Sequence, residues 1–71
     1  MKFHYDAETD SLYIELRPGP GTDAAEIAPD VVADFDAVRQ IVGLDIQHAS
    51  QRLDLSCIEF DGLVAAAQRA E

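Results

Sequence analysis

Short stretches in which apolar and polar residues alternate dominate the first two thirds of the chain. Clear alternation occurs over residues 2–5, 11–16, 31–36 and 41–46, and a weaker form over 22–27. A period of two places successive side chains on opposite faces of a strand, so each stretch predicts a β-strand. Because short segments rich in turn-forming residues separate them, we expect strands that pair as antiparallel hairpins.

The stretch over residues 41–46 differs from the others. It is apolar on both of its faces apart from Gly43 and Asp45. A strand of this kind is expected to be the most buried one, and either a helix or a second subunit would have to cover its second face.

The pattern changes after Gln47. Residues 49–52 suit a helical turn, whereas residues 55–60 alternate again and favour a strand over the helix that their spacing also permits. The alanine-rich residues 63–70 then predict a helix, with Asp61 as its N-cap. The predicted fold is therefore an α+β domain over residues 1–71, a small antiparallel β-meander of four to six strands with a short C-terminal helix.

The size of the chain indicates that it associates. A chain of 71 residues buries only about 60% of its unfolded surface, and small domains are usually supported by disulfides, a metal or a partner. The single cysteine excludes an intramolecular disulfide. A homodimer is the form of support that we expect.

The charge balance limits the partners. Five basic residues against 14 acidic ones give a net charge of −9, and the basic residues are spread singly. Direct nucleic-acid binding and a basic membrane-surface helix are therefore disfavoured, whereas a small basic protein partner fits. No apolar run approaches the ~20 residues of a membrane span and no signal peptide is visible, so the expected location is cytoplasmic.

Asp6, Glu8 and Asp10 have the spacing that begins an EF-hand loop. The rest of that pattern fails, because Ser11 stands where the loop needs glycine and Arg17 where it needs a bidentate glutamate. We instead predict a hairpin turn in which Asp6 caps backbone N–H groups and Asp10 closes the loop. No metal site and no cofactor are expected.

No catalytic constellation is visible, so the protein is expected not to be an enzyme. Cys57 with His4 or His48 is the only conceivable dyad, and no local sequence supports it. Cys57 is better interpreted as a small buried hydrophobe. Core packing is likewise the default expectation for the aromatic residues, including Phe3 and Tyr5.

The best candidates for interaction lie on the outward face of the predicted strands. Tyr13 falls opposite Leu12 and Ile14, and tyrosine is enriched at binding hot spots. Carboxylates of the second hairpin could gather on one side, although solvated, edge-protecting carboxylates are the simpler interpretation. The candidate set is Tyr13, Glu15, Asp34, Asp36 and Asp45.

Three ordered motifs carry a resemblance to a known family. HYDAETDSLYI at residues 4–14, APDVVADFD at 28–36, and IVGLDI at 41–46 followed by Ala49-Ser50 resemble the DUF2283 patterns Y-D-x-x-x-D-x-L-Y-I, A-P-G-V-x-x-D-x-D and I-V-G-I-E-I-x-x-A-S. The resemblance implies a small β-rich bacterial fold without established activity. Because members sometimes lie beside genes for toxin-like proteins, it also suggests an antitoxin or partner-binding role.

The chain departs from the family pattern at Arg39, where glycine is frequent. A left-handed backbone at an arginine costs roughly 1 kcal/mol, so a wider or differently shaped loop is expected there.

Two functions from different classes remain open. The first is a non-enzymatic interaction module that binds a protein through an edge strand or its apolar sheet face. The alternative is a small-ligand or metal-binding domain with its site at a homodimer interface, lined by His4, His48 and the loop of residues 6–10.

Overall fold

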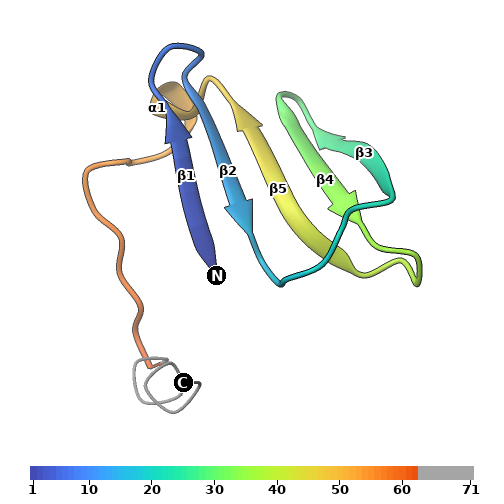
Figure 1. The fold of residues 1–71 in the computed structure, drawn as a ribbon. Coiled ribbons are helices and arrows are strands. Elements are labelled where there is room, and N and C mark those ends of the chain that lie inside the picture. Colours follow the sequence, from blue (N-terminus) through green and yellow to red (C-terminus); the bar gives the residue numbers. More distant parts are fainter. Residues whose placement is uncertain (63–71) are drawn as a thin grey trace.

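A computed structural model describes residues 1–62 of the chain. Its five strands form one antiparallel sheet in the spatial order β1-β2-β5-β4-β3, with one short helix after the last strand (Figure 1). The elements are β1 (Lys2–Asp6), β2 (Ser11–Glu15), β3 (Asp23–Ala28), β4 (Val31–Phe35), β5 (Ile41–Gln47) and α1 (Ala49–Arg52). The predicted antiparallel sheet and the helical turn over residues 49–52 are confirmed.

The sheet consists of a hairpin, β1-β2, joined to a three-strand meander, β3-β4-β5. Residues 16–22 carry the chain from one sheet half to the other, so that β5 returns to pair with β2. Leu12 on β2 lies opposite Ile46, and Val31 on β4 lies opposite the same residue from the other side. β5 therefore occupies the centre of the sheet.

The register separates an apolar face from a polar face. Tyr5 lies opposite Leu12, and Ile14 lies opposite both Phe3 and Leu44. The residues between them point to the other side because side chains alternate along a strand. We call this other side the polar face; its members include Lys2, His4, Ser11, Tyr13, Glu15, Asp34 and Asp45.

The buried core of the described residues is small. Its hydrophobic members are Leu12, Ala33, Val42, Ile46 and Ala49, and no large side chain is completely enclosed. Two of the five belong to β5, which confirms the prediction that this strand is the most buried, whereas every residue of β1 and β3 is exposed. Full burial of a leucine or isoleucine contributes about 1.5–3 kcal/mol, so this core alone stabilises the sheet weakly.

Two aspartates tie the hairpin turns to α1. Asp10, in the β1–β2 turn, accepts hydrogen bonds from the backbone N–H of Ser50 on Oδ1 (3.0 Å) and from that of Ala49 on its carbonyl oxygen (2.9 Å). Asp30, in the β3–β4 turn, lies 3.0 Å from Nδ1 of His48 and 3.3 Å from Arg52. Both aspartates have a left-handed backbone, with φ of 55° and 67°.

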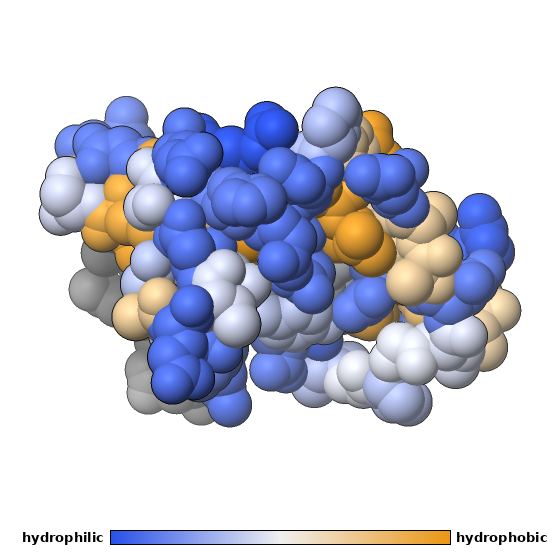
Figure 2. Space-filling view, turned by 90° about the horizontal axis from the view of Figure 1, so that it is seen from above, coloured by the Kyte–Doolittle hydropathy of each residue, from blue (hydrophilic) through white to orange (hydrophobic). Residues whose placement is uncertain are grey.

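The predicted roles of Asp6 and Asp10 in the first turn are confirmed. Oδ1 of Asp6 accepts the backbone N–H of Glu8 at 3.0 Å, and Asp10, the last residue of the turn, closes the loop by accepting a 2.6 Å hydrogen bond from the Tyr5 hydroxyl. Seen from the end where this turn and α1 lie, the surface is mostly hydrophilic, with separate apolar patches (Figure 2). Of residues 1–62, no helix is long and apolar enough to cross a membrane.

The predicted strand over residues 55–60 is wrong. Residues 53–62 form an irregular segment without strand pairing. Asp54 accepts the backbone N–H of Ser56 at 3.0 Å, and this local turn competes with an extended ladder. Alternation alone does not make a strand, because a strand also needs a neighbour for its backbone groups. The predicted helix over 63–70 lies outside the described residues.

The β4–β5 loop also differs from expectation. Arg39 adopts a left-handed backbone with φ 68°, and its N–H bonds to the carbonyl oxygen of Asp36 at 3.0 Å. The loop is therefore tight, and Arg39 adopts the unfavourable left-handed backbone. The Arg39 guanidinium lies over the Phe35 ring at 5.0 Å and pairs with Asp23 at 3.3 Å, which offsets part of that cost.

Candidate interaction surfaces

Four of the five predicted interaction residues lie together on the polar face. Tyr13 is the direct cross-strand neighbour of Asp45, while Glu15 and Asp34 flank Gly43 from the two sides. All four side chains are partly buried. The sheet thus gathers three carboxylates around one phenol over β2, β5 and β4.

Tyr13 reaches across β5 to contact β4. Its hydroxyl donates a 2.9 Å hydrogen bond to Oδ2 of Asp34, and the phenol lies directly over Gly43. A Cβ atom added at Gly43 would overlap the hydroxyl oxygen and the ring carbon that carries it. The glycine is needed here for space, because its φ is not among the left-handed ones.

The neighbouring carboxylates act electrostatically on Tyr13. Its pKa is raised above 10.0, first by the hydrogen bond to Asp34 and then by partial burial. The negative charges of Asp34, Glu15 and Asp45 add to the same effect, because the phenolate would be a further anion among carboxylates. The three acids therefore lie close enough to form one negative surface.

Asp36 does not join this group. Its Oδ1 accepts the backbone N–H groups of Val38 (3.0 Å) and Gln40 (2.9 Å) within the β4–β5 loop. The carboxylate replaces backbone partners that the tight turn leaves open, so it has a structural role in the loop. The sequence pattern did not separate Asp36 from Asp34, since both fall on the same side of the predicted strand.

The conceivable catalytic dyad is not assembled in residues 1–62. His48 contacts Asp30, and His4 lies on the polar face opposite Tyr13. Cys57 is exposed, which contradicts its prediction as a buried hydrophobe, and its Sγ lies 3.7 Å from Glu59. Cys57 directly follows the turn at residues 55–56, in the irregular segment of residues 53–62 that pairs with no strand. Within the described part of the chain, no group of three His, Cys, Asp or Glu side chains lies close enough to hold a metal ion.

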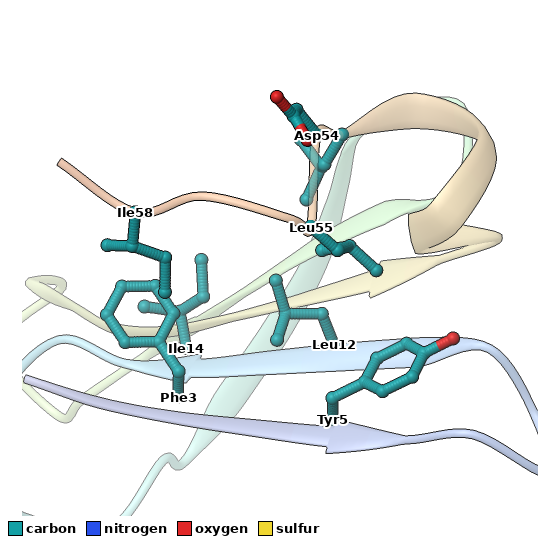
Figure 3. A pocket seen from close by; sticks show the side chains of 8 residues that line it. Phe3, Tyr5, Leu12, Ile14, Asp54, Leu55 and Ile58 are labelled. Carbon is teal, nitrogen blue, oxygen red and sulfur yellow. The ribbon is translucent and has the colours of Figure 1, made fainter.

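The apolar face carries a groove of about 490 Å³ that sequence reasoning missed. Residues 53–62 run along the outer side of β1 (Figure 1) at a level above the apolar face, and they form the second wall of the groove, with Leu55 and Ile58 facing the sheet (Figure 3). The groove is lined by Phe3, Tyr5, Leu12, Ile14, Leu53, Asp54, Leu55 and Ile58. The available signal was an apolar alternation that continued beyond the last paired strand.

The groove is incompletely filled. The expectation that its aromatic residues pack in the core is wrong. Phe3 is 37% exposed, Tyr5 43% and Ile58 60%. Tyr5 lies at one end of the groove, where its hydroxyl donates a 2.6 Å hydrogen bond to Asp10. The molecule therefore has two unlike surfaces, one acidic and one apolar.

Comparison with known proteins gives a family but no activity. No curated protein and no solved structure matches the chain. The family described as "Protein of unknown function (DUF2283)" matches residues 2–50, which include all five strands and the start of α1. The chain therefore belongs to the DUF2283 family.

Proposed function

We propose that this chain is a non-enzymatic interaction module whose polar face binds a small basic protein, as an antitoxin binds its partner. The observation that supports this most directly is the cluster of Tyr13 with Glu15, Asp34 and Asp45 on one side of the central strands. An aromatic residue surrounded by like charges suits a partner that brings lysine or arginine.

The distribution of cationic residues supports the same proposal. Arg39 pairs with Asp23 and Arg52 with Asp30, so these two cations already have acidic partners outside the cluster. Arg17 contacts Gln40 in the loops after β2 and β4. Lys2, on the edge strand, is the only lysine or arginine within the five strands of the sheet. The negative field over the three central strands is therefore little compensated.

A negative field of this kind acts mainly on the rate at which the two proteins associate. Complementary charges raise association rates and suppress wrong partners more than they raise affinity. Burial of Tyr13 against the partner would supply the apolar contact area. The chain's own homodimer, predicted from its size, would present two such faces.

The test uses charge reversal that leaves the Tyr13–Asp34 hydrogen bond intact. Glu15→Lys with Asp45→Lys changes the polar face, and Glu8→Lys with Asp61→Lys makes the same change of net charge at exposed sites elsewhere. Tagged native protein and both double variants are used for affinity capture from the native lysate, followed by mass spectrometry.

A small basic protein that is retained by the native form and the control, but lost with Glu15→Lys/Asp45→Lys, supports the proposal. Its association rate should fall steeply as salt is added. Equal capture by all three forms would contradict a role of the polar face.

The apolar groove favours a second candidate function, binding of a small apolar ligand. Its volume lies within the range of ligand sites, about 300–1,000 Å³. Binding of an apolar fluorescent dye should weaken with Ile58→Asp and persist with Ile27→Asp, which introduces the same charge on β3, outside the groove. Unchanged binding in Ile58→Asp would remove this candidate.

A further inference from the structure

The sheet ends at β1, whose outer edge has no strand neighbour among residues 1–62. All five residues of this strand are exposed, and β2 pairs with it on one side only. A free edge presents unpaired N–H and C=O groups, which makes it a template for another strand. The sequence of β1 determines which strand fits.

β1 is complementary to itself. When two copies run antiparallel with His4 opposite His4, Lys2 of one copy lies opposite Asp6 of the other at both ends of the ladder. In the same register Phe3 lies opposite Tyr5. Opposite charges and aromatic pairs directly across a ladder each contribute roughly 0.2–1 kcal/mol. A parallel, in-register arrangement would instead place lysine beside lysine.

This register also preserves the two faces of the sheet. Phe3 and Tyr5 belong to the apolar face, whereas Lys2, His4 and Asp6 belong to the polar face. Pairing about His4 sets apolar residues opposite apolar ones, so that the apolar faces of the two copies become continuous. A shift by one residue would place Phe3 opposite a polar side chain.

The sequence of β3, the other edge strand, disfavours such pairing. β3 contains Asp23 and Glu26 and no cationic residue, so two copies of it would bring only like charges together. A register irregularity between Glu26 and Ala28 further disturbs its ladder. Because the two edges differ in this way, association through β1 closes as a symmetric pair and does not propagate.

The segment of residues 53–62 supplies a second, independent indication. It leaves α1 and runs on the outer side of β1, away from β2 (Figure 1), at a level above the apolar face (Figure 3). Ile58 and Phe60 within it are 60% and 45% exposed. Ile58 faces the groove, and the segment therefore leaves apolar surface exposed beside the free edge of β1.

We infer that two copies of this chain associate through antiparallel pairing of β1 with β1 about His4, and that Lys2 of each copy pairs with Asp6 of the partner subunit. The backbone ladder and the joined apolar faces hold the dimer, while the two ion pairs select the register. The groove then becomes a shared apolar channel, roofed by residues 53–62 of both copies.

This inference deepens the proposed function, since it defines the homodimer that would present two acidic faces on the same side. It rests on contacts different from those of the polar-face cluster. Self-association is measured on the protein alone, so failure of the dimer and failure of basic-partner binding are separate outcomes.

The experiment is sedimentation equilibrium of the full chain over a concentration series, with Lys2→Glu, with Asp6→Lys, and with an equimolar mixture of the two. Each variant alone sets like charges opposite each other at both ends of the ladder. The mixture restores opposite charges at both ends, because the carboxylate introduced at position 2 of one chain meets the ammonium group introduced at position 6 of the other. Glu8→Lys, at an exposed position in the β1–β2 turn, is the matched control for a single charge reversal outside the ladder.

We expect the native chain and Glu8→Lys to dimerise alike, and each β1 variant to dimerise roughly tenfold more weakly. The mixture should regain native affinity, which also shows that both variants fold. Asp6→Asn is a milder second variant, because it keeps the acceptor for the Glu8 N–H but loses the charge. A native chain that stays monomeric, or a dimer that no β1 variant weakens, would overturn the inference.

Discussion

The Tyr13 hydroxyl donates a 2.9 Å hydrogen bond to Asp34 across an intervening strand, and Gly43 is the residue that it crosses. The two partners are 21 residues apart in the chain and belong to strands that do not pair with each other. The contact therefore connects the two halves of the sheet. It also keeps the hydroxyl end of the ring over β5, directly above Gly43.

Gly43→Ala should destabilise the protein by about 1–3 kcal/mol, because the added methyl group would displace the Tyr13 ring. Chemical denaturation monitored by circular dichroism measures the free energy of unfolding. The cost should largely disappear in a Tyr13→Ala background, where the methyl group has room. An equal cost in both backgrounds would place the strain elsewhere.

Removing the Asp34 charge should lower the pKa of Tyr13 toward 10.0. The hydrogen bond to Asp34 is the largest cause of the raised value, and Asp34→Asn removes the charge while keeping an acceptor oxygen. The absorbance of phenolate during alkaline titration reports this pKa, with Tyr5→Phe to remove the only other tyrosine. Asp36→Asn is the control, because Asp36 contacts backbone groups of its own loop.

Stability should fall on the acid side through Asp10 and Asp30. A hydrogen bond from Tyr5 lowers the pKa of Asp10 below 3.8, and contact with His48 does the same for Asp30. Aspartates with a depressed folded-state pKa stabilise the protein fully above their unfolded value, and this contribution is lost as pH falls through about 3.8 and below.

The measurement is the free energy of unfolding of native protein and of Asp10→Asn and Asp30→Asn between neutral and acidic pH. Both variants should be less stable than the native chain at neutral pH and show a shallower loss on acidification. Asp61→Asn, at an exposed site outside the sheet, should follow the native curve. Variant curves as steep as the native one would assign the acid sensitivity to other groups.

The left-handed backbone at Arg39 predicts a difference between two substitutions. Arg39→Ala loses the contacts with Phe35 and Asp23 but keeps the unfavourable φ of 68°. Arg39→Gly loses the same contacts and relieves the strain, so it should be more stable than the alanine variant by roughly 1 kcal/mol. Thermal and denaturant unfolding of the pair test this. Equal stabilities would mean that the loop relaxes its backbone in the alanine variant.

Most of the local structure was predictable from the sequence. Alternation over residues 11–16 and 31–36 identified β2 and β4 with the correct inward residues, since period two maps directly onto the faces of a strand. The turn aspartates Asp6 and Asp10 were assigned correctly for a similar reason. Asp6 bonds to the N–H of Glu8 and Asp10 to the hydroxyl of Tyr5, both nearby in the chain, whereas the bonds of Asp10 with Ala49 and Ser50 depend on the tertiary structure.

Prediction failed where a residue's partner lay far away in the chain. Alternation over residues 55–60 predicted a strand, but the segment pairs with neither edge of the sheet and runs along the outer side of β1 in an irregular conformation. Cys57 is exposed for the same reason. The sequence pattern did not distinguish Asp36 from Asp34. In the structure Asp36 accepts backbone N–H groups of its own loop, whereas Asp34 accepts the hydroxyl of Tyr13.

The sequence by itself determined which residues before Gln47 form strands, where the chain turns between them, the sign of its charge and its family, because these depend on neighbours along the chain. The tertiary structure decided that β5 inserts between β2 and β4, and with it the Tyr13–Asp34 contact, the grouping of the carboxylates and the open groove. Strand order depends on pairing between segments that are distant in the chain. The period-two pattern predicts the face on which each side chain lies, but it does not predict which strand lies beside it.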